Sequence, residues 1–165
     1  MIMTATASSG VTARIREAGV VGAGGAGFPV HVKWGARVDT VIANGAECEP
    51  LLHKDAEIIE NFAAPVLDGL RLAAEATGAG RLCFGIKAKK KGAIAALEKH
   101  APSRRVELSL LGDYYPTGDE FELVHAVTGR LIPPAGLPLE VGVVVNNVES
   151  LLNAAMAVEG KPVTT

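Results

Sequence analysis

The residues of this sequence that first suggest chemistry are glycines. Gly22, Gly24 and Gly27 have the spacing GxGxxG within the run VVGAGGAG, and Pro29 follows where a helix is expected to begin. Glycines at this spacing let backbone N–H groups approach a phosphate closely, and a helix N-terminus favours the negative charge. The pattern therefore predicts a phosphate-binding loop, with a glycine-rich turn that holds no ligand as the alternative.

The residues before these glycines disfavour an ordinary NAD-binding Rossmann site. A dinucleotide fingerprint follows a full strand. Here only Val20 and Val21 precede the loop, after a short helical pattern at residues 11–18 that Gly19 ends. An NAD-dependent dehydrogenase is thus a weaker interpretation than a loop that binds another phosphate-bearing cofactor.

The rest of the chain alternates between strand and helix patterns. Strands are expected at residues 38–43, 81–86, 106–111 and 141–145. Helices are expected just after Pro29 and at residues 55–76, 90–100, 118–127 and 147–158. Pro65 should kink or split the long helix, which Gly78 ends.

This order of elements predicts an α/β fold, a three-layer Rossmann-like domain whose mostly parallel sheet is covered by helices. We expect residues 1–10 to form a flexible tail and residues 11–160 to form the domain. Residues 161–165 would begin a further C-terminal region that the chain lacks. A length of 165 residues suits one such domain.

Composition excludes several classes of function. The net charge of −2 and the lack of a basic face argue against nucleic-acid binding. Two cysteines, Cys48 and Cys83, cannot by themselves supply a four-thiolate iron–sulfur or zinc site. No segment approaches the ~20 apolar residues of a membrane span and no signal peptide is evident, so we expect a soluble, cytoplasmic protein.

Four segments, in order, resemble the flavin-pocket segments of the family that contains the respiratory complex I flavoprotein subunit. They are GAGGAGFPVHVKW (22–34), IANGAECEP (42–50), YPTGDE (115–120) and VVVNNVESL (143–151). Within that family, AGVVGAGGAGFP together with NGAECEP is more similar to the Rnf-complex C subunits and to the cobalamin reductases of propanediol-utilising microcompartments, the latter more closely. The resemblance implies an FMN-binding domain.

The first segment would hold the FMN phosphate. The resemblance implies that Gly22, Gly24, Gly25 and Gly27 wrap the phosphate and that Lys33 reaches back as its cationic partner. For Lys33 a solvated surface lysine is the alternative.

The second segment would contact the ribityl chain, the ring or nicotinamide. The Asn44 amide lies where a strand opens into a turn, and the carboxylates of Glu47 and Glu49 suit polar contacts better than a metal. The alternatives are a turn residue for Asn44 and a solvated carboxylate for Glu49. Complex I carries an arginine in place of Ala23 and an acidic residue in place of Ala46, so its nicotinamide contacts do not transfer directly.

The third and fourth segments complete the predicted pocket. Tyr115 would border the cofactor, with core packing as the alternative, and Glu120 matches the acidic position of the third segment. Asn146 and Asn147 open the closing helix, where amides and side chains could meet the phosphate; an N-cap alone is the alternative for Asn147.

The resemblance implies that NADH delivers a hydride to FMN, while the protein contributes binding and orientation. Electrons would pass on, to cobalamin in the more similar relatives, through iron–sulfur clusters outside this chain. Expected partners are NADH and a downstream acceptor or cluster-bearing domain, inside a microcompartment or on the cytoplasmic side of a membrane complex. The alternative is a noncatalytic flavin- or nucleotide-binding docking module.

Overall fold

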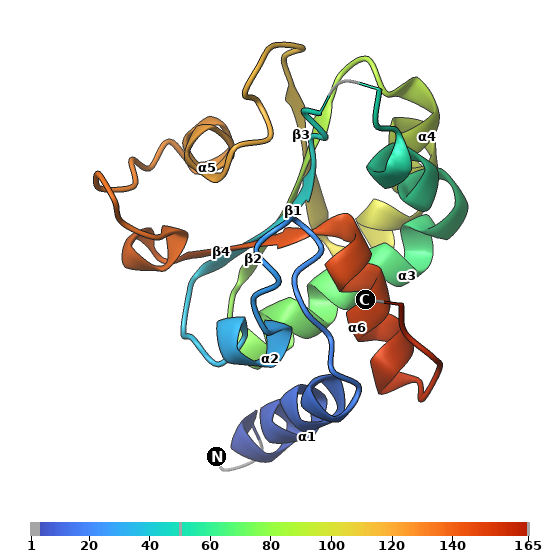
Figure 1. The fold of residues 1–165 in the computed structure, drawn as a ribbon, viewed down its shortest axis with the longest axis vertical. Coiled ribbons are helices and arrows are strands. Elements are labelled where there is room, and N and C mark those ends of the chain that lie inside the picture. Colours follow the sequence, from blue (N-terminus) through green and yellow to red (C-terminus); the bar gives the residue numbers. More distant parts are fainter. Residues whose placement is uncertain (1–3, 50, 165) are drawn as a thin grey trace.

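The structure, a computed structural model, describes residues 4–49 and 51–164. Its centre is a four-stranded sheet in the order β3-β2-β1-β4, in which every neighbouring pair is parallel (Figure 1). The strands are β1 (Thr40–Gly45), β2 (Arg81–Lys87), β3 (Val106–Leu111) and β4 (Val143–Asn147). This arrangement confirms the predicted α/β fold class.

Alternating side chains of the strands fill two separate cores. Val41 and Ala43 of β1 face the first core, whereas Ile42 faces the second, as the two-residue period of a strand requires. In β4, Val144 faces the first core and Val145 the second. Because both faces are apolar, both must be covered by other elements.

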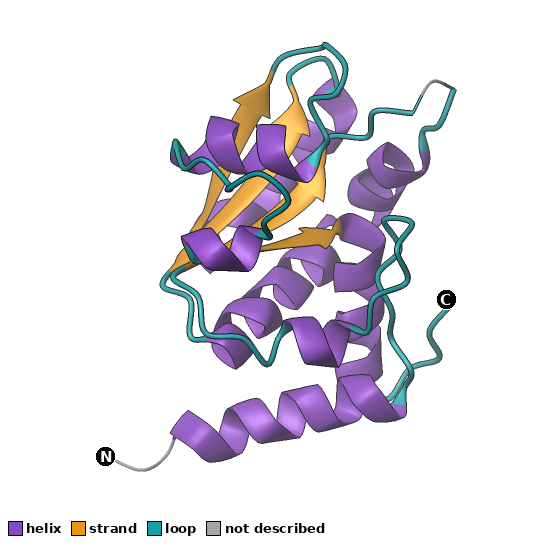
Figure 2. Cartoon of the chain, turned by 60° about the vertical axis from the view of Figure 1, so that its left-hand side comes forward, coloured by secondary structure: helices purple, strands orange, loops and turns teal. Residues whose placement is uncertain are grey.

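Helices cover the two faces unequally and so make three layers (Figures 1 and 2). The first core packs against the helices α1 (Thr4–Glu17), α3 (Lys54–Thr77), α4 (Lys91–Arg104) and α6 (Val148–Val158). The second packs against α5 (Glu120–Thr128) and the 3-10 helix η1 (Pro138–Val141). The remaining helix, α2 (Val30–Lys33), is a single turn. No helix in the described ranges is long and apolar enough to cross a membrane.

Proline and glycine shape the long helix α3 as the sequence indicates. Its backbone departs from helical geometry at Phe62, three residues before Pro65. A proline removes the hydrogen bond to the carbonyl four residues earlier and its ring crowds that carbonyl, so the irregularity lies just before it. Gly78 ends the helix with φ of 76°, in the left-handed region that glycine adopts readily.

Several boundaries differ from those predicted. Residues 4–10, where the sequence predicts a flexible tail, lie in α1, which begins at Thr4; residues 1–3 lie outside the described residues. Ile15, which is fully buried, anchors the second half of α1. The segment before it is rich in Ala, Thr and Ser and contains no proline that would stop the helix.

At the carboxyl edge of the sheet, β1 and β4 each end two residues later than predicted. Asn44 therefore lies near the end of a strand rather than in a turn. The Asn146–Asn147 pair forms the last two positions of β4, directly before α6. Helix α5 begins at Glu120 instead of Gly118, because the Asp119 side chain accepts hydrogen bonds from the amides of Phe121 and Glu122 and fixes the start there. The carboxyl edge of the sheet therefore carries more polar side chains than the predicted boundaries implied.

Candidate cofactor-binding site

A cavity of about 610 Å³ lies at the carboxyl edge of the sheet. Its walls come from the glycine loop, α2, the ends of β1 and β4, η1 and the starts of α5 and α6. Open parallel sheets bind ligands at this edge, and the volume lies within the ~300 to 1,000 Å³ usual for small-molecule sites. Seven of the predicted site residues border it: Gly22, Gly24, Lys33, Asn44, Glu120, Asn146 and Asn147.

The glycine loop is a closed hairpin-like turn. The amide of Gly22 donates to the carbonyl of Phe28 at 2.9 Å, and the amide of Val30 donates to the carbonyl of Val20 at 3.1 Å. Between these bonds, Gly25 has φ of 106° and Gly27 has φ of 60°, which explains the need for glycine. Within the described part of the chain, the amides of residues 24–27 donate no hydrogen bond. They are exposed and so available to a ligand.

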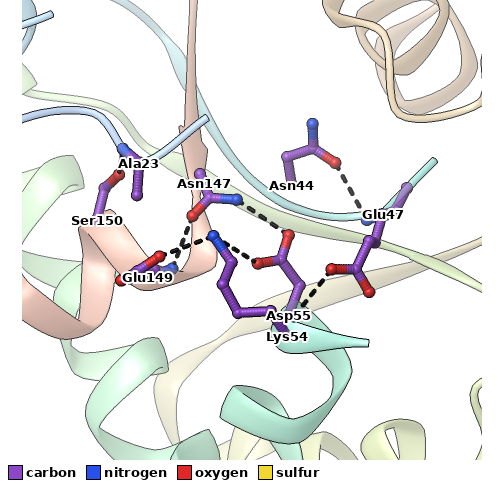
Figure 3. A network of polar contacts seen from close by, with 9 residues as sticks. Ala23, Asn44, Glu47, Lys54, Asp55, Asn147, Glu149 and Ser150 are labelled. Carbon is purple, nitrogen blue, oxygen red and sulfur yellow. Dashed lines mark hydrogen bonds and ion pairs between the residues drawn. The ribbon is translucent and has the colours of Figure 1, made fainter. Parts of the chain in front are cut away.

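The helix that faces this loop is α6, which corrects the expectation of a phosphate-binding helix directly after Pro29. That segment is only the single turn α2. The hydroxyl of Ser150, in the first turn of α6, accepts a hydrogen bond from the amide of Ala23 at 2.8 Å (Figure 3). A Cβ on Gly24 would lie 3.8 Å from that of Asn147, the N-cap of α6. The positive end of an eleven-residue helix is therefore next to the exposed amides.

A polar network supports the start of α6 (Figure 3). The Asn147 side chain accepts from the amide of Glu149 at 2.9 Å and donates to Asp55 at 3.0 Å. Lys54 donates to Glu149 at 2.7 Å and lies 3.7 Å from Asp55. Burial raises the pKa of the Asp55 carboxyl to about 6, against the opposing effect of the Lys54 ammonium. Asn147 is thus an N-cap that also borders the cavity, and its predicted contact with the phosphate stays a prediction.

Glu47 belongs to this network and does not border the cavity. Its Oε1 accepts a hydrogen bond from the amide of Asp55 at 3.3 Å, at the start of α3. Its Oε2 is buried and has no partner among the described residues. Glu47 therefore contacts the start of α3 outside the cavity wall, next to the buried carboxylate of Asp55.

Asn44 joins the second predicted segment to the third. Its Nδ2 donates to the carbonyl of Gly118 at 2.9 Å, and its Oδ1 accepts from the amide of Ala46 at 3.1 Å. The amide of Gly118 in turn donates to the sulfur of Cys48 at 2.7 Å, and a Cβ on Gly118 would overlap the Ala46 carbonyl. Both polar atoms of Asn44 thus have protein partners and join two loops at the cavity wall. Its predicted contact with the cofactor stays a prediction.

Lys33 and Glu120 form a pair of opposite charges at the wall of the cavity. The Lys33 ammonium donates to the carbonyl of Val145 at 2.8 Å and lies 3.8 Å from a Glu120 oxygen. The Lys33 side chain is thus partly buried and bonded to the end of β4. Its predicted contact with a phosphate stays a prediction.

Asn146 borders the cavity and has a buried hydrogen-bond donor that is not used. The indole N–H of Trp34 donates to Asn146 Oδ1 at 2.8 Å. The Nδ2 of Asn146 is buried without a partner in the described residues. Buried amide groups are normally paired, so this donor fits a ligand that carries an acceptor.

The remaining predicted residues lie outside the cavity wall. Gly25 and Gly27 shape the loop; Glu49 is exposed. Tyr115 is 82% exposed, which rules out the alternative of core packing. None of these four borders the cavity, and their contacts with a cofactor stay predictions.

Sequence reasoning missed several wall residues. Ser150 lies three residues after the N-cap Asn147 inside the fourth segment, so its position in the first turn of a helix was a usable signal. Phe28 lies inside the first segment that resembles the flavin loop, so the same kind of signal was available for it. The residues of η1, including Pro138, carried no such signal because they read as turn or loop. They add apolar surface, so the cavity combines apolar walls with polar groups, as a flat ring that carries a phosphate requires.

Comparisons with known proteins agree with this geometry. The chain matches the family model described as the Nuo51 FMN-binding domain over residues 15–156. Cobalamin reductase PduS of Citrobacter freundii is 49% identical over 152 residues, which are 92% of this chain and 34% of that protein. A component of the proton-translocating ferredoxin:NAD(+) oxidoreductase complex of Clostridium ljungdahlii is 40% identical over 149 residues, 88% of this chain and 33% of that protein.

A solved structure agrees as well. The crystal structure of an NAD+-reducing NiFe hydrogenase in the H2-reduced state superposes with a TM-score of 0.79 at 28% identity, covering 94% of this chain and 31% of that one. The chain thus spans about a third of the length of each of these relatives.

Proposed function

Since this chain belongs to the family of the Nuo51 FMN-binding domain, we propose that it binds FMN in the cavity at the carboxyl edge of its sheet. The observation that carries the proposal is the convergence of exposed loop amides and the N-terminus of α6 at one end of that cavity. These groups suit a dianionic phosphate. An unpaired amide and apolar walls at the other parts of the cavity suit a flat, polar-edged ring.

The phosphate is bound by backbone rather than by a cluster of basic side chains. The amides of Gly24 and Ala26, which border the cavity, face it, and the Ser150 hydroxyl, which already accepts from Ala23, orients the loop toward α6. Lys33 supplies one positive charge near the end of β4, where Glu120 partly offsets it. A neutral ligand of the same shape gains little from this arrangement.

We further propose that the domain takes part in NADH-linked electron transfer. FMN, when bound, accepts a hydride from NADH and can give up electrons singly. The chain's own residues bind and orient the cofactor and keep the ring against the apolar wall of Phe28 and Pro138. Cobalamin, or an iron–sulfur acceptor in a larger protein or complex, is the proposed destination of the electrons, by analogy with relatives three times as long.

Titration of the purified chain with FMN and with riboflavin tests the proposal. We expect FMN to bind roughly 10- to 100-fold more tightly, because riboflavin lacks the phosphate that the loop amides and α6 address. Ser150→Ala should reduce that ratio, whereas Ser103→Ala, on the exposed end of α4, should not. Equal affinity for both flavins, or no binding of either, contradicts the proposal.

Reduction of the bound flavin tests the second step. NADH added without oxygen should bleach the flavin absorbance of the FMN-loaded chain faster than it bleaches free FMN. A rate equal to that of free FMN would mean that the chain contributes no orientation of the two cofactors, and the docking interpretation would then be favoured.

A further inference from the structure

The side chains of Trp34 and Asn146 meet in the interior beside the cavity. Trp34 follows α2 and is fully buried, and Asn146 lies near the end of β4 and is 3% exposed. Their hydrogen bond joins positions 112 residues apart in the sequence. The bond connects the segment after the glycine loop to β4, the strand whose residues line the cavity.

The chemistry of indole fixes which way the Asn146 amide points. The two ends of an asparagine amide look alike in size, so their assignment depends on the neighbours. Indole nitrogen is a donor only, so it can bond the oxygen and not the nitrogen of Asn146. The Nδ2 group must therefore point away from Trp34, and there it has no partner among the described residues.

The unpaired donor has no acceptor in the described part of the chain, so a ligand could supply one. Asn146 borders the cavity, as do Val143, Val144 and Val145 before it. The exposed amides at residues 24–27 already provide donors for a phosphate. The acceptor that we assign to Asn146 is an oxygen or nitrogen on the ring of the ligand.

We propose that Trp34 is a positioning residue that holds the Asn146 amide with its NH2 group toward the cavity, so that the site selects a ring that presents a hydrogen-bond acceptor. The inference rests on the proposed function, in which that ring belongs to FMN. Trp34 acts only through Asn146 and does not border the cavity itself. Without the indole N–H, the amide is free to rotate, and the donor is presented only part of the time.

A double-mutant cycle tests this coupling. Trp34→Phe keeps an aromatic ring in the core and removes only the donor, and it should weaken FMN binding about tenfold. Asn146→Ala should weaken it at least as much, and the double variant should bind FMN no more weakly than Asn146→Ala alone. Phe84→Leu is the control, because Phe84 is fully buried in the same core and does not border the cavity. It should lower stability and leave FMN affinity unchanged.

Outcomes of the cycle separate the inference from the proposed function. Additive losses from the two single substitutions would overturn the inference while FMN binding by the unaltered chain stands. Absence of FMN binding by the unaltered chain would overturn both.

A second measurement needs no variant to fold. The side-chain NH2 resonances of Asn146 should shift when FMN saturates the unaltered chain, and the Trp34 indole N–H should exchange slowly both with and without FMN. NH2 resonances that do not move on saturation would overturn the inference.

Discussion

At the scale of single residues, the most unusual group is the Asp55 carboxylate beneath the N-terminus of α6. It is 6% exposed, it accepts a hydrogen bond from Asn147, and its Oδ1 has no hydrogen-bond donor among the described residues, with only the Lys54 ammonium at 3.7 Å. Burial is the largest influence on its pKa, which rises to about 6, and the nearby carboxylates of Glu47 and Glu149 add to the rise. The charged form is therefore held at a cost to folding.

Stability between about pH 4 and 7 should depend on the titration of Asp55. Because the folded pKa of Asp55 is raised, its contribution is fully present below about 3.8 and is lost as the pH rises through about 6. Asp55→Asn should keep the acceptor for Asn147 and remove the charge. At pH 7.5 it should raise the free energy of unfolding by an amount on the order of 3 kcal/mol or less.

Urea unfolding of both proteins at pH 4.5, 5.5 and 7.5 measures this effect. The advantage of the asparagine variant should grow as the pH rises. An advantage that is the same at all three values would show that Asp55 does not titrate in this range.

At the scale of elements, the glycine loop and α6 form the unit that is proposed to bind phosphate. Gly24 has no strained backbone angle, and a Cβ there would make ordinary contact with Asn147. Gly24 nevertheless borders the cavity. Glycine is thus needed at this position for the approach of a ligand more than for the fold.

Gly24→Val should separate these two roles. We expect the free energy of unfolding to change by less than about 1 kcal/mol, because the backbone conformation is open to other residues. FMN affinity should fall by about tenfold or more, because the branched side chain blocks access to the loop amides. Circular dichroism and flavin titration would measure the two effects, and equal losses of fold and of binding would mark the loop as purely structural.

Helix α3 packs closely against α6 and so helps to position α6 beside the glycine loop. A Cβ on Gly69 of α3 would overlap the carbonyl group of Leu151 in α6, which is backbone and cannot turn aside. Gly69→Ala should therefore push α6 away and cost about 1 to 3 kcal/mol despite the better helix propensity of alanine.

The matched control is Gly80→Ala, where a Cβ would meet nothing within 4 Å. Thermal unfolding should show a clear loss for the first variant and almost none for the second. Similar melting temperatures for both variants would contradict the close contact between the helices.

Sequence patterns predicted elements better than they predicted which helix serves the site. The period of apolar residues and the glycines placed β3 and the end of α3 correctly. They could not show that the segment after Pro29 would be one turn, nor that α6 would face the glycine loop, because that contact depends on packing between residues more than a hundred positions apart. Ser150 and Pro138 reach the cavity through the same tertiary arrangement.

At the scale of the whole molecule, the three layers bring one end of the sheet together with segments from most of the chain. The order β3-β2-β1-β4 places β1 beside β4, so Asn44 and the Asn146–Asn147 pair share an edge although about a hundred residues separate them. Helices α3 and α6 then close one side of that edge, and α5 and η1 the other (Figure 1). The resemblance to flavin-pocket segments, confirmed by the family match, therefore corresponds to one continuous cavity.

Amide NMR spectra of the chain, recorded as FMN is added, test the central claim most directly. We predict shifts in residues 22–28, at the ends of β1 and β4 and in the first turn of α6, with β3 and α4 unchanged because they lie away from the cavity. Riboflavin at saturation should reproduce the strand shifts and leave residues 24–27 largely unmoved. Shifts that cluster on β3 or α4, or no shifts at millimolar FMN, would contradict FMN binding at this site.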